Sequence, residues 1–182
     1  MYTNCHTYYS LRYGTFSEIE LLELAQQNNI KQLALTDINS TSACLSIIKN
    51  APNYNIDVSV GVDFRNGTRQ QYVVIAEDNV GFQNINAFLT EHLHKKKVFP
   101  ELCPKLENCF VIYPFEKVLE LEKKEFSANE FIGISIVSLR KLLFSRYRHY
   151  DNLAIQQPVS FRNQNDYNAH RLLRAIDLNI LL

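Results

Sequence analysis

The sequence predicts an α/β fold, a (β/α) barrel of six or seven units with one inserted β-hairpin. Three observations lead to this prediction. Short apolar runs of strand length alternate along the chain with segments of helical periodicity, which is typical of a mostly parallel sheet covered by helices. An Asn66-Gly67 pair between two alternating apolar runs indicates a hairpin. The number of strand–helix units, about six or seven, favours a barrel over an open sheet.

The elements follow in order, and the first helix has the clearest start. Ser17 and Glu20 form a capping box, in which each side chain bonds the backbone N–H of the other residue. Thr41 or Ser42 is expected to cap a second helix. The expected strands are residues 1–5, 32–36, 56–64, 70–76, 109–113, 131–135 and 153–156. The expected helices are residues 18–28, 43–50, 80–94, 116–124 and 138–146, and a last helix that Asn165 or Asp166 caps and that ends at 176.

Composition and charge exclude several classes of protein. The 182 residues, 46% apolar and 21% charged, are enough for one soluble domain that spans residues 1–182. A formal net charge of zero argues against a strongly electrostatic nucleic-acid binder. The cysteines lack C-x-x-C spacing, and neither a signal peptide nor a membrane-spanning apolar run is visible, so we expect a cytoplasmic protein without a membrane partner.

The end of the sequence is unusually apolar. Residues 178–182 stop inside an apolar stretch without a cap or a polar tail. This pattern indicates that the chain was cut from a longer protein. We also expect an exposed apolar patch near Leu178 to Leu182, and some tendency of the chain to self-associate.

Three side chains that can bind metal, His6, Asp37 and Asp63, stand at the ends of expected strands. Strand ends at one mouth of a (β/α) barrel are where such folds build active sites. One histidine and two carboxylates could hold a hard or borderline divalent metal, although two-metal phosphoesterase chemistry needs more ligands. The alternative is that both aspartates cap turns or helix starts and that His6 bonds inside the core.

A basic stretch near the end of the chain is the other candidate for function. Its cations are Arg140, Lys141, Arg146 and Arg148. They could contact the phosphates of DNA or an acidic partner, and the plainer interpretation is an exposed, solvated face. The sequence contains no phosphate-binding glycine loop and no nucleophile elbow.

Several segments resemble the motifs of one family. Residues 4–14 (NCHTYYSLRYG) resemble the first motif of the PHP (polymerase and histidinol phosphatase) domain, in the form that opens the alpha subunit of bacterial DNA polymerase III, and most of all its Bacteroidetes form. Residues 33–40 (LALTDINS) resemble the second motif, and residues 61–64 (GVDF) resemble the third. Residues 170–179 resemble a helix near the end of that domain. The resemblance implies a distorted (β/α)7 barrel whose strand ends hold up to three metals, and phosphoester hydrolysis in some members.

Most of the metal-ligand positions that the resemblance implies are altered in this chain. His6, Asp37 and Asp63 remain as a vestigial set. The other positions carry Asn4, Tyr13, Ile38, Gln71, Phe115, Pro158 and Ser160. Apolar side chains in a metal cage remove ligands and desolvate the remaining charge, so we expect no bound cofactor and no catalytic residue. If a metal is bound, it is expected to be Mn, Zn or Mg.

Hydrogen bonds and apolar packing are expected to replace the metal in the former site. The predicted hydrogen-bond partners of Asp37 or His6 are Asn4, Gln71 and Ser160. The side chains predicted to fill the remaining space are Tyr13, Ile38 and Phe115.

The resemblance thus implies the N-terminal PHP domain of a DNA-directed DNA polymerase, a nucleotidyltransferase of DNA replication, with this domain itself inactive. Its expected role is structural: it braces the downstream polymerase domains of the same chain and docks a proofreading exonuclease subunit. Two alternatives remain open. One is a residual metal-dependent phosphoesterase or 3′–5′ exonuclease that uses His6, Asp37 and Asp63, and the other is a module with weak DNA contacts.

Overall fold

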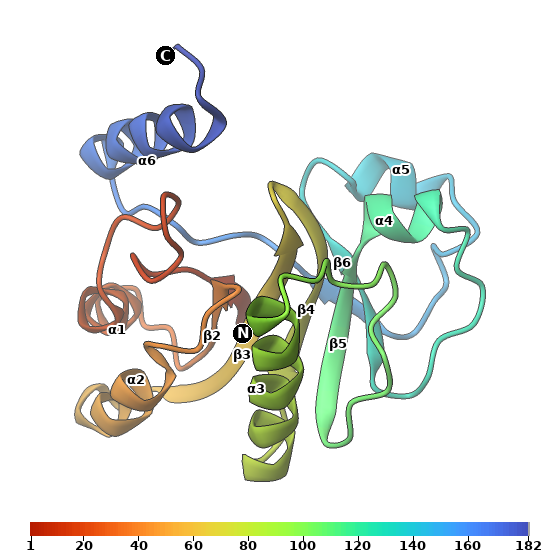
Figure 1. Ribbon diagram of the computed structural model, residues 1–182, viewed down its shortest axis with the longest axis horizontal. Coiled ribbons are helices and arrows are strands. Elements are labelled where there is room, and N and C mark those ends of the chain that lie inside the picture. The colour runs from red at the N-terminus through yellow and green to blue at the C-terminus, as the bar shows by residue number, and fades with distance from the viewer. Residues whose placement is uncertain (182) are drawn as a thin grey trace.

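The computed structural model describes residues 1–181, and in this part of the chain seven strands form one sheet (Figure 1). Each strand pairs with its neighbours in sequence, from β1 to β7. The strands are β1 (Tyr2–Cys5), β2 (Gln32–Ile38), β3 (Asp57–Asn66), β4 (Arg69–Ala76), β5 (Cys109–Pro114), β6 (Glu130–Ile134) and β7 (Leu153–Ile155). The helices are α1 (Glu18–Gln27), α2 (Cys44–Asn50), the 3-10 helix η1 (Ala51–Tyr54), α3 (Asn79–His94), α4 (Phe115–Glu120), α5 (Leu139–Leu143) and α6 (Gln164–Leu178).

One strand runs against all the others, as the predicted hairpin requires. Strand β4 pairs antiparallel with both β3 and β5, whereas β1–β2–β3 and β5–β6–β7 pair in parallel. The turn between β3 and β4 contains Gly67 at φ +61°, a left-handed conformation that glycine adopts without strain. The carboxyl ends of the six strands other than β4 therefore face the same mouth.

The sheet closes on itself through the segment that follows β7. Val159 forms a parallel bridge with Cys5, donates its N–H to Asn4 O (2.9 Å) and accepts from His6 N (2.8 Å). Thr3 Oγ1 also donates to Ile155 O at 2.9 Å. The prediction of a distorted (β/α)7 barrel is thereby confirmed. We refer to residues 156–160 as the closing strap.

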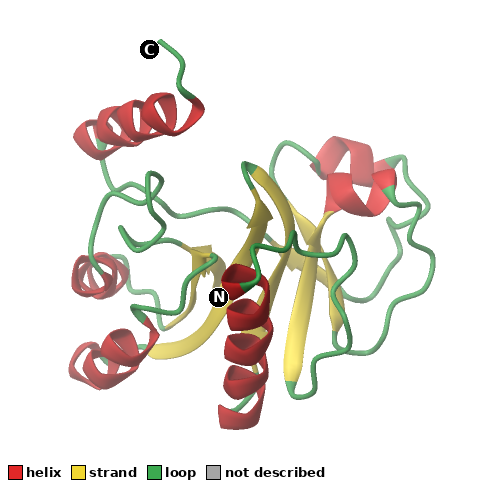
Figure 2. Ribbon diagram, in the orientation of Figure 1, coloured by secondary structure: helices red, strands yellow, loops and turns green. Residues whose placement is uncertain are grey.

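Apolar side chains fill both the barrel and the space between its strands and helices. The small interior cluster consists of Ala34, Val73, Ile75 and Ile112. A second cluster packs strands β1–β3 against α1 and α2, and a third packs β3–β6 against α3, α4 and α5. Figure 2 shows the helices arranged outside the strands, with α6 at the periphery. Among the residues that the structure describes, no helix is long and apolar enough to cross a membrane.

Several predicted boundaries are wrong. Helix α2 starts with Ala43 at its N-cap and lacks a side-chain cap, because Thr41 Oγ1 instead donates to Asn86 Oδ1 on α3 (2.8 Å). The cap of α6 is Asn163, which lies two residues before the first predicted cap and accepts from the N–H of Asp166. Helices α4 and α5 end four and three residues early, since the chain turns back toward β6 and β7; Glu122 adopts φ +48° in the first of these turns.

The capping box of α1 is confirmed and predicts a measurable contribution to stability. Glu20 N donates to Ser17 Oγ (3.2 Å), and Ser17 N donates to Glu20 Oε2 (2.8 Å). We expect Ser17→Ala to lower the free energy of unfolding by about 1 kcal/mol, measured by urea denaturation. Ser42→Ala is the matched control, because Ser42 caps no helix and is exposed. Equal losses in the two variants would contradict the prediction.

Candidate functional site

The fold brings the three predicted metal-binding side chains to one mouth of the barrel. His6 follows β1, Asp37 lies near the end of β2, and Asp63 lies on β3, where its register partner is Ile38. All three side chains are buried, with at most 1% of each residue exposed. They sit where the parallel strands end, which is the position that the sequence predicts.

Asp37 is a structural anchor for the loop after β1. Its Oδ1 accepts hydrogen bonds from Thr7 N (2.6 Å) and Ser10 Oγ (2.7 Å), and its Oδ2 accepts from Thr7 Oγ1 (2.7 Å). Ser10 Oγ in turn accepts from Ile38 N (2.9 Å). Burial raises the pKa of Asp37, and the bonds from Ser10 and Thr7 oppose that rise. Both carboxylate oxygens are therefore already engaged, and this aspartate caps no helix.

His6, Asp63 and Arg65 form a buried ionic cluster. His6 Nε2 donates to Asp63 Oδ2 (3.0 Å), and the same oxygen accepts from Arg65 Nε (3.0 Å) and Arg65 Nη2 (2.7 Å). The Arg65 side chain is only 11% exposed and the other two are fully buried. Burial alone would raise the pKa of Asp63, but the bond from His6 and the charge of Arg65 outweigh it and lower that pKa.

Sequence analysis missed Arg65, although a local pattern pointed to it. Residues two apart on a strand face the same side, so Arg65 shares a face of β3 with Asp63. The alternation of side chains along β3 predicts only which face of the strand Arg65 occupies. The structure shows that its guanidinium turns back onto the Asp63 carboxylate.

Tyr13 and Ser160 complete the cluster, as predicted. Ser160 Oγ lies 3.0 Å from His6 Nδ1, because the closing strap carries it to the end of β1. The Tyr13 ring packs edge-on against the His6 ring (5.1 Å between centroids) and lies under the Arg65 guanidinium (4.7 Å). His170 on α6 donates through Nδ1 to Tyr13 O (2.7 Å). These two sequence predictions are confirmed.

Three other predictions about the former ligand positions are wrong. Asn4 Oδ1 accepts from Thr36 Oγ1 (3.1 Å), and Gln71 Nε2 donates to Arg69 O (3.0 Å), so neither amide bonds Asp37 or His6. Both amides find nearer partners on adjacent strands or within their own strand. Phe115 starts α4 and packs in the outer core against Tyr147, with 6.2 Å between ring centroids.

The remaining two positions lie near the mouth. Ile38 is half-buried and donates its N–H to Ser10, so it stays at the edge of the cluster. Pro158 lies on the closing strap and lines a cavity at the mouth.

The donor set does not fit a divalent metal. Both nitrogens of His6, both oxygens of Asp37 and Oδ2 of Asp63 already have hydrogen-bond partners, and only Asp63 Oδ1 has none. Within residues 1–181, no three His, Cys, Asp or Glu side chains lie close enough to hold a metal ion. A tetrahedral or octahedral site needs several such donors at once. Arg65 supplies the positive charge that neutralises Asp63.

The predicted basic stretch is an exposed surface. Arg140 and Lys141 lie on α5, Arg146 and Arg148 lie in the turn after it, and all four are exposed. Lys141 Nζ lies 3.5 Å from Glu116 Oε1. The guanidinium of Arg146 stacks over the ring of Tyr147 (4.9 Å). This geometry is compatible with either of the two interpretations of the stretch.

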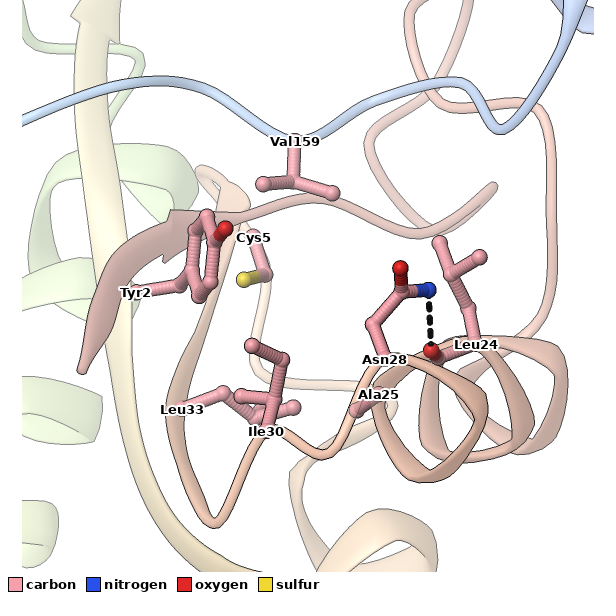
Figure 3. A pocket seen from close by; sticks show the side chains of 8 residues that line it. All are labelled: Tyr2, Cys5, Leu24, Ala25, Asn28, Ile30, Leu33 and Val159. Atoms are coloured by element: carbon pink, nitrogen blue, oxygen red, sulfur yellow. Dashed lines mark hydrogen bonds between the residues drawn. The ribbon is translucent and has the colours of Figure 1, made fainter.

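A second cavity lies between α1, β1, β2 and the closing strap (Figure 3). It has a volume of about 230 Å³ and is lined by Tyr2, Cys5, Leu24, Ala25, Asn28, Ile30, Leu33 and Val159. The one amide in this lining, Asn28, already donates to Leu24 O (2.8 Å). Burial, with a smaller effect from Asp37, raises the pKa of the Cys5 thiol to about 12, so the thiolate nucleophile is absent at neutral pH. We assign no chemistry to this cavity.

Comparison with known proteins identifies the family of this fold. The profile of the PHP domain family matches residues 3–121. This chain belongs to the PHP domain family. The match covers the β1–α1–β2 segment and the β3–β4 hairpin, which carry His6, Asp37, Asp63 and Arg65 of this PHP domain. None of the curated proteins matches the sequence.

Two solved structures resemble this PHP domain. One is an amidohydrolase from Chromobacterium violaceum with bound sulfate and no metal, at 12% identity and a TM-score of 0.54, over 87% of each chain. The other is a protein from Bifidobacterium adolescentis named as a metal-dependent phosphoesterase, at 16% identity and a TM-score of 0.40 over 49% of this chain. The PHP domain spans 31% of that protein's length. At these identities the first likeness supports the fold alone.

Proposed function

We propose that this PHP domain is a catalytically inactive structural domain at the start of the alpha subunit of a DNA-directed DNA polymerase. One observation carries the proposal of inactivity: the Arg65 guanidinium is bonded to Asp63 at the barrel mouth, where a PHP metal would need that carboxylate. The polymerase assignment is supported by the motifs of residues 4–14 and 33–40, which resemble that form of the family.

In this proposal, the buried cluster stabilises the barrel mouth in place of a metal. An uncompensated buried carboxylate is strongly unfavourable, whereas a carboxylate with two N–H donors from one guanidinium is neutralised and hydrogen-bonded. His6, Tyr13 and Ser160 pack around that pair. These side-chain contacts join the ends of β1 and β3 to the closing strap, which suits a structural role.

Exposed apolar side chains support a role in packing against other domains. The predicted patch near the end of the chain is confirmed for Leu178, Ile180 and Leu181, which are 45%, 59% and 97% exposed, whereas Leu182 lies outside the described residues. Large apolar surfaces that remain exposed on one domain are typical of interfaces. In this proposal, downstream polymerase domains and a proofreading exonuclease subunit are the partners.

One observation favours the rival function, a residual phosphoesterase or 3′–5′ exonuclease. Asp63 Oδ1 is buried and has no hydrogen-bond partner, so it could coordinate a metal ion if Arg65 moved away. The rival then needs His6 and Asp37 to give up bonds that they make in the folded domain.

Metal content decides between the two. We expect elemental mass spectrometry of protein purified without chelator to find well below one Mn, Zn or Mg per chain, and we expect no hydrolysis of bis-p-nitrophenyl phosphate. One or more metals per chain that survive dialysis and disappear in His6→Ala would overturn the proposal of inactivity. The polymerase assignment is tested separately. The polymerase alpha subunit to which this proposal assigns the domain should extend a primed DNA template.

A further inference from the structure

A cavity of about 180 Å³ opens at the same mouth, on the side of strands β5, β6 and β7. Its lining combines residues at the ends of these strands with residues of β1 and of the hairpin. The lining residues with polar side chains are Asn4, Arg65, Gln70, Glu116, Ser135 and Gln156. Since a cavity needs only about 10–15 Å³ of such volume to hold one water, this one has room for several waters or one small ligand.

Two amide groups in this cavity have no hydrogen-bond partner. Gln156 is only 6% exposed, and its Nε2 is buried and unpartnered. Gln70 Nε2 is also buried and unpartnered. Among residues 1–181, five buried side-chain atoms lack a partner, and these two line one cavity. Buried donors without acceptors are unfavourable, so a cavity that gathers them is suited to a ligand that supplies acceptors.

The backbone holds Gln156 in place. Its N–H donates to Ile134 O (2.9 Å), which extends the pairing of β7 with β6. Its amide lies against Gly133, where an added Cβ would come within 2.1 Å of Gln156 Oε1. A side chain at position 133 would therefore have to displace this amide from its place at the barrel mouth.

Arg65 adds a hydrogen-bond donor to the same cavity, while the charge of Asp63 balances its own. Its Nε and Nη2 bond Asp63, so Nη1 is the guanidinium nitrogen without a described bond to that carboxylate. The negative group in the lining, Glu116, is half-exposed and lies 3.5 Å from Lys141 Nζ, so solvent and a cation offset its charge.

We propose that this cavity binds a small oxyanion, a carboxylate or a phosphate group, whose oxygens accept hydrogen bonds from Gln70, Gln156 and Arg65. Guanidinium and amide N–H groups are the donors that such oxygens use in proteins. The lining includes two of the altered ligand positions, Asn4 and Pro158, but none of His6, Asp37 and Asp63. It goes beyond the proposed function and does not rest on it.

Titration of the purified protein with inorganic phosphate, acetate and neutral acetamide tests this proposal, followed by NMR amide shifts. We expect saturable one-site binding of phosphate or acetate, weakened about tenfold or more in Gln156→Leu. Gln157→Leu is the matched control. Gln157 follows Gln156 in the chain and its side chain is exposed, so this variant should bind the anions like the wild type. The stronger of the two anions identifies the ligand group.

Stability provides a second readout that a merely structural role would not give. Because Gln156→Leu removes an unpartnered donor, it should melt at or above the wild-type temperature without ligand, while losing the anion's stabilisation. Gln70→Leu is a second variant with the same expected loss of binding, if Gln156→Leu fails to fold. Three results would overturn the proposal: no saturable anion binding, unchanged binding in folded variants of both glutamines, or acetamide binding as tight as that of the anions.

Discussion

Replacing Arg65 by alanine is expected to lower the free energy of unfolding by about 3–5 kcal/mol, which is the usual effect of removing one partner of a buried ion pair. Asp63 is fully buried, and its Oδ2 receives both bonds from the guanidinium. Without Arg65, the carboxylate keeps only the bond from His6. The variant must then bury an uncompensated charge or protonate the acid.

Arg69→Ala is the matched control for that experiment. Arg69 lies on the other strand of the same hairpin and pairs with Glu120, but both side chains are about half exposed, at 51% and 53%. Exposed ion pairs contribute about 0–1 kcal/mol, so this variant should unfold close to the wild type. Urea denaturation of both variants measures the difference. Similar losses for Arg65→Ala and Arg69→Ala would mean that the buried pair is not what holds the barrel mouth.

The second large effect is expected for Asp37→Asn, at about 2–4 kcal/mol of lost stability. An asparagine has the same shape, but it lacks the charge and replaces one acceptor oxygen by an NH2 group. That group would face donors from Thr7 or Ser10, which now bond the carboxylate. Hydrogen bonds to charged groups contribute about 1.5–3 kcal/mol each, and a buried donor left unpaired adds to the loss.

Asp57→Asn is the control for this substitution, because Asp57 is exposed at the start of β3. Its effect should stay within about 0.5 kcal/mol. Hydrogen exchange gives a local readout: in Asp37→Asn the amide of Thr7 should exchange faster, since that N–H donates to Asp37 Oδ1. A stable Asp37→Asn with an equally protected Thr7 amide would show that the anchor is dispensable.

Local patterns determined much of this fold. The Asn66-Gly67 turn, the capping box at Ser17 and the apolar pattern that predicts β3 each act within a few residues, and the structure contains the turn, the capping box and the strand. Parallel strands place their carboxyl ends at one mouth, so the meeting of His6 with Asp63 also followed from the order of elements. Helix ends were less predictable, because α4 and α5 stop where the chain must return to the sheet.

The tertiary structure alone decided how the mouth is held together and what it can bind. Ser160 reaches His6 across 154 residues because the closing strap pairs with β1, and Gln156 fits over Gly133 because β7 pairs with β6. Arg65 turns onto Asp63 because the barrel leaves that carboxylate buried without a closer cation. Such partners depend on strand register and on closure of the sheet, which are set by the summed packing of distant segments. The sequence by itself therefore determined the barrel and the location of its mouth, and the folded chain determined the chemistry there.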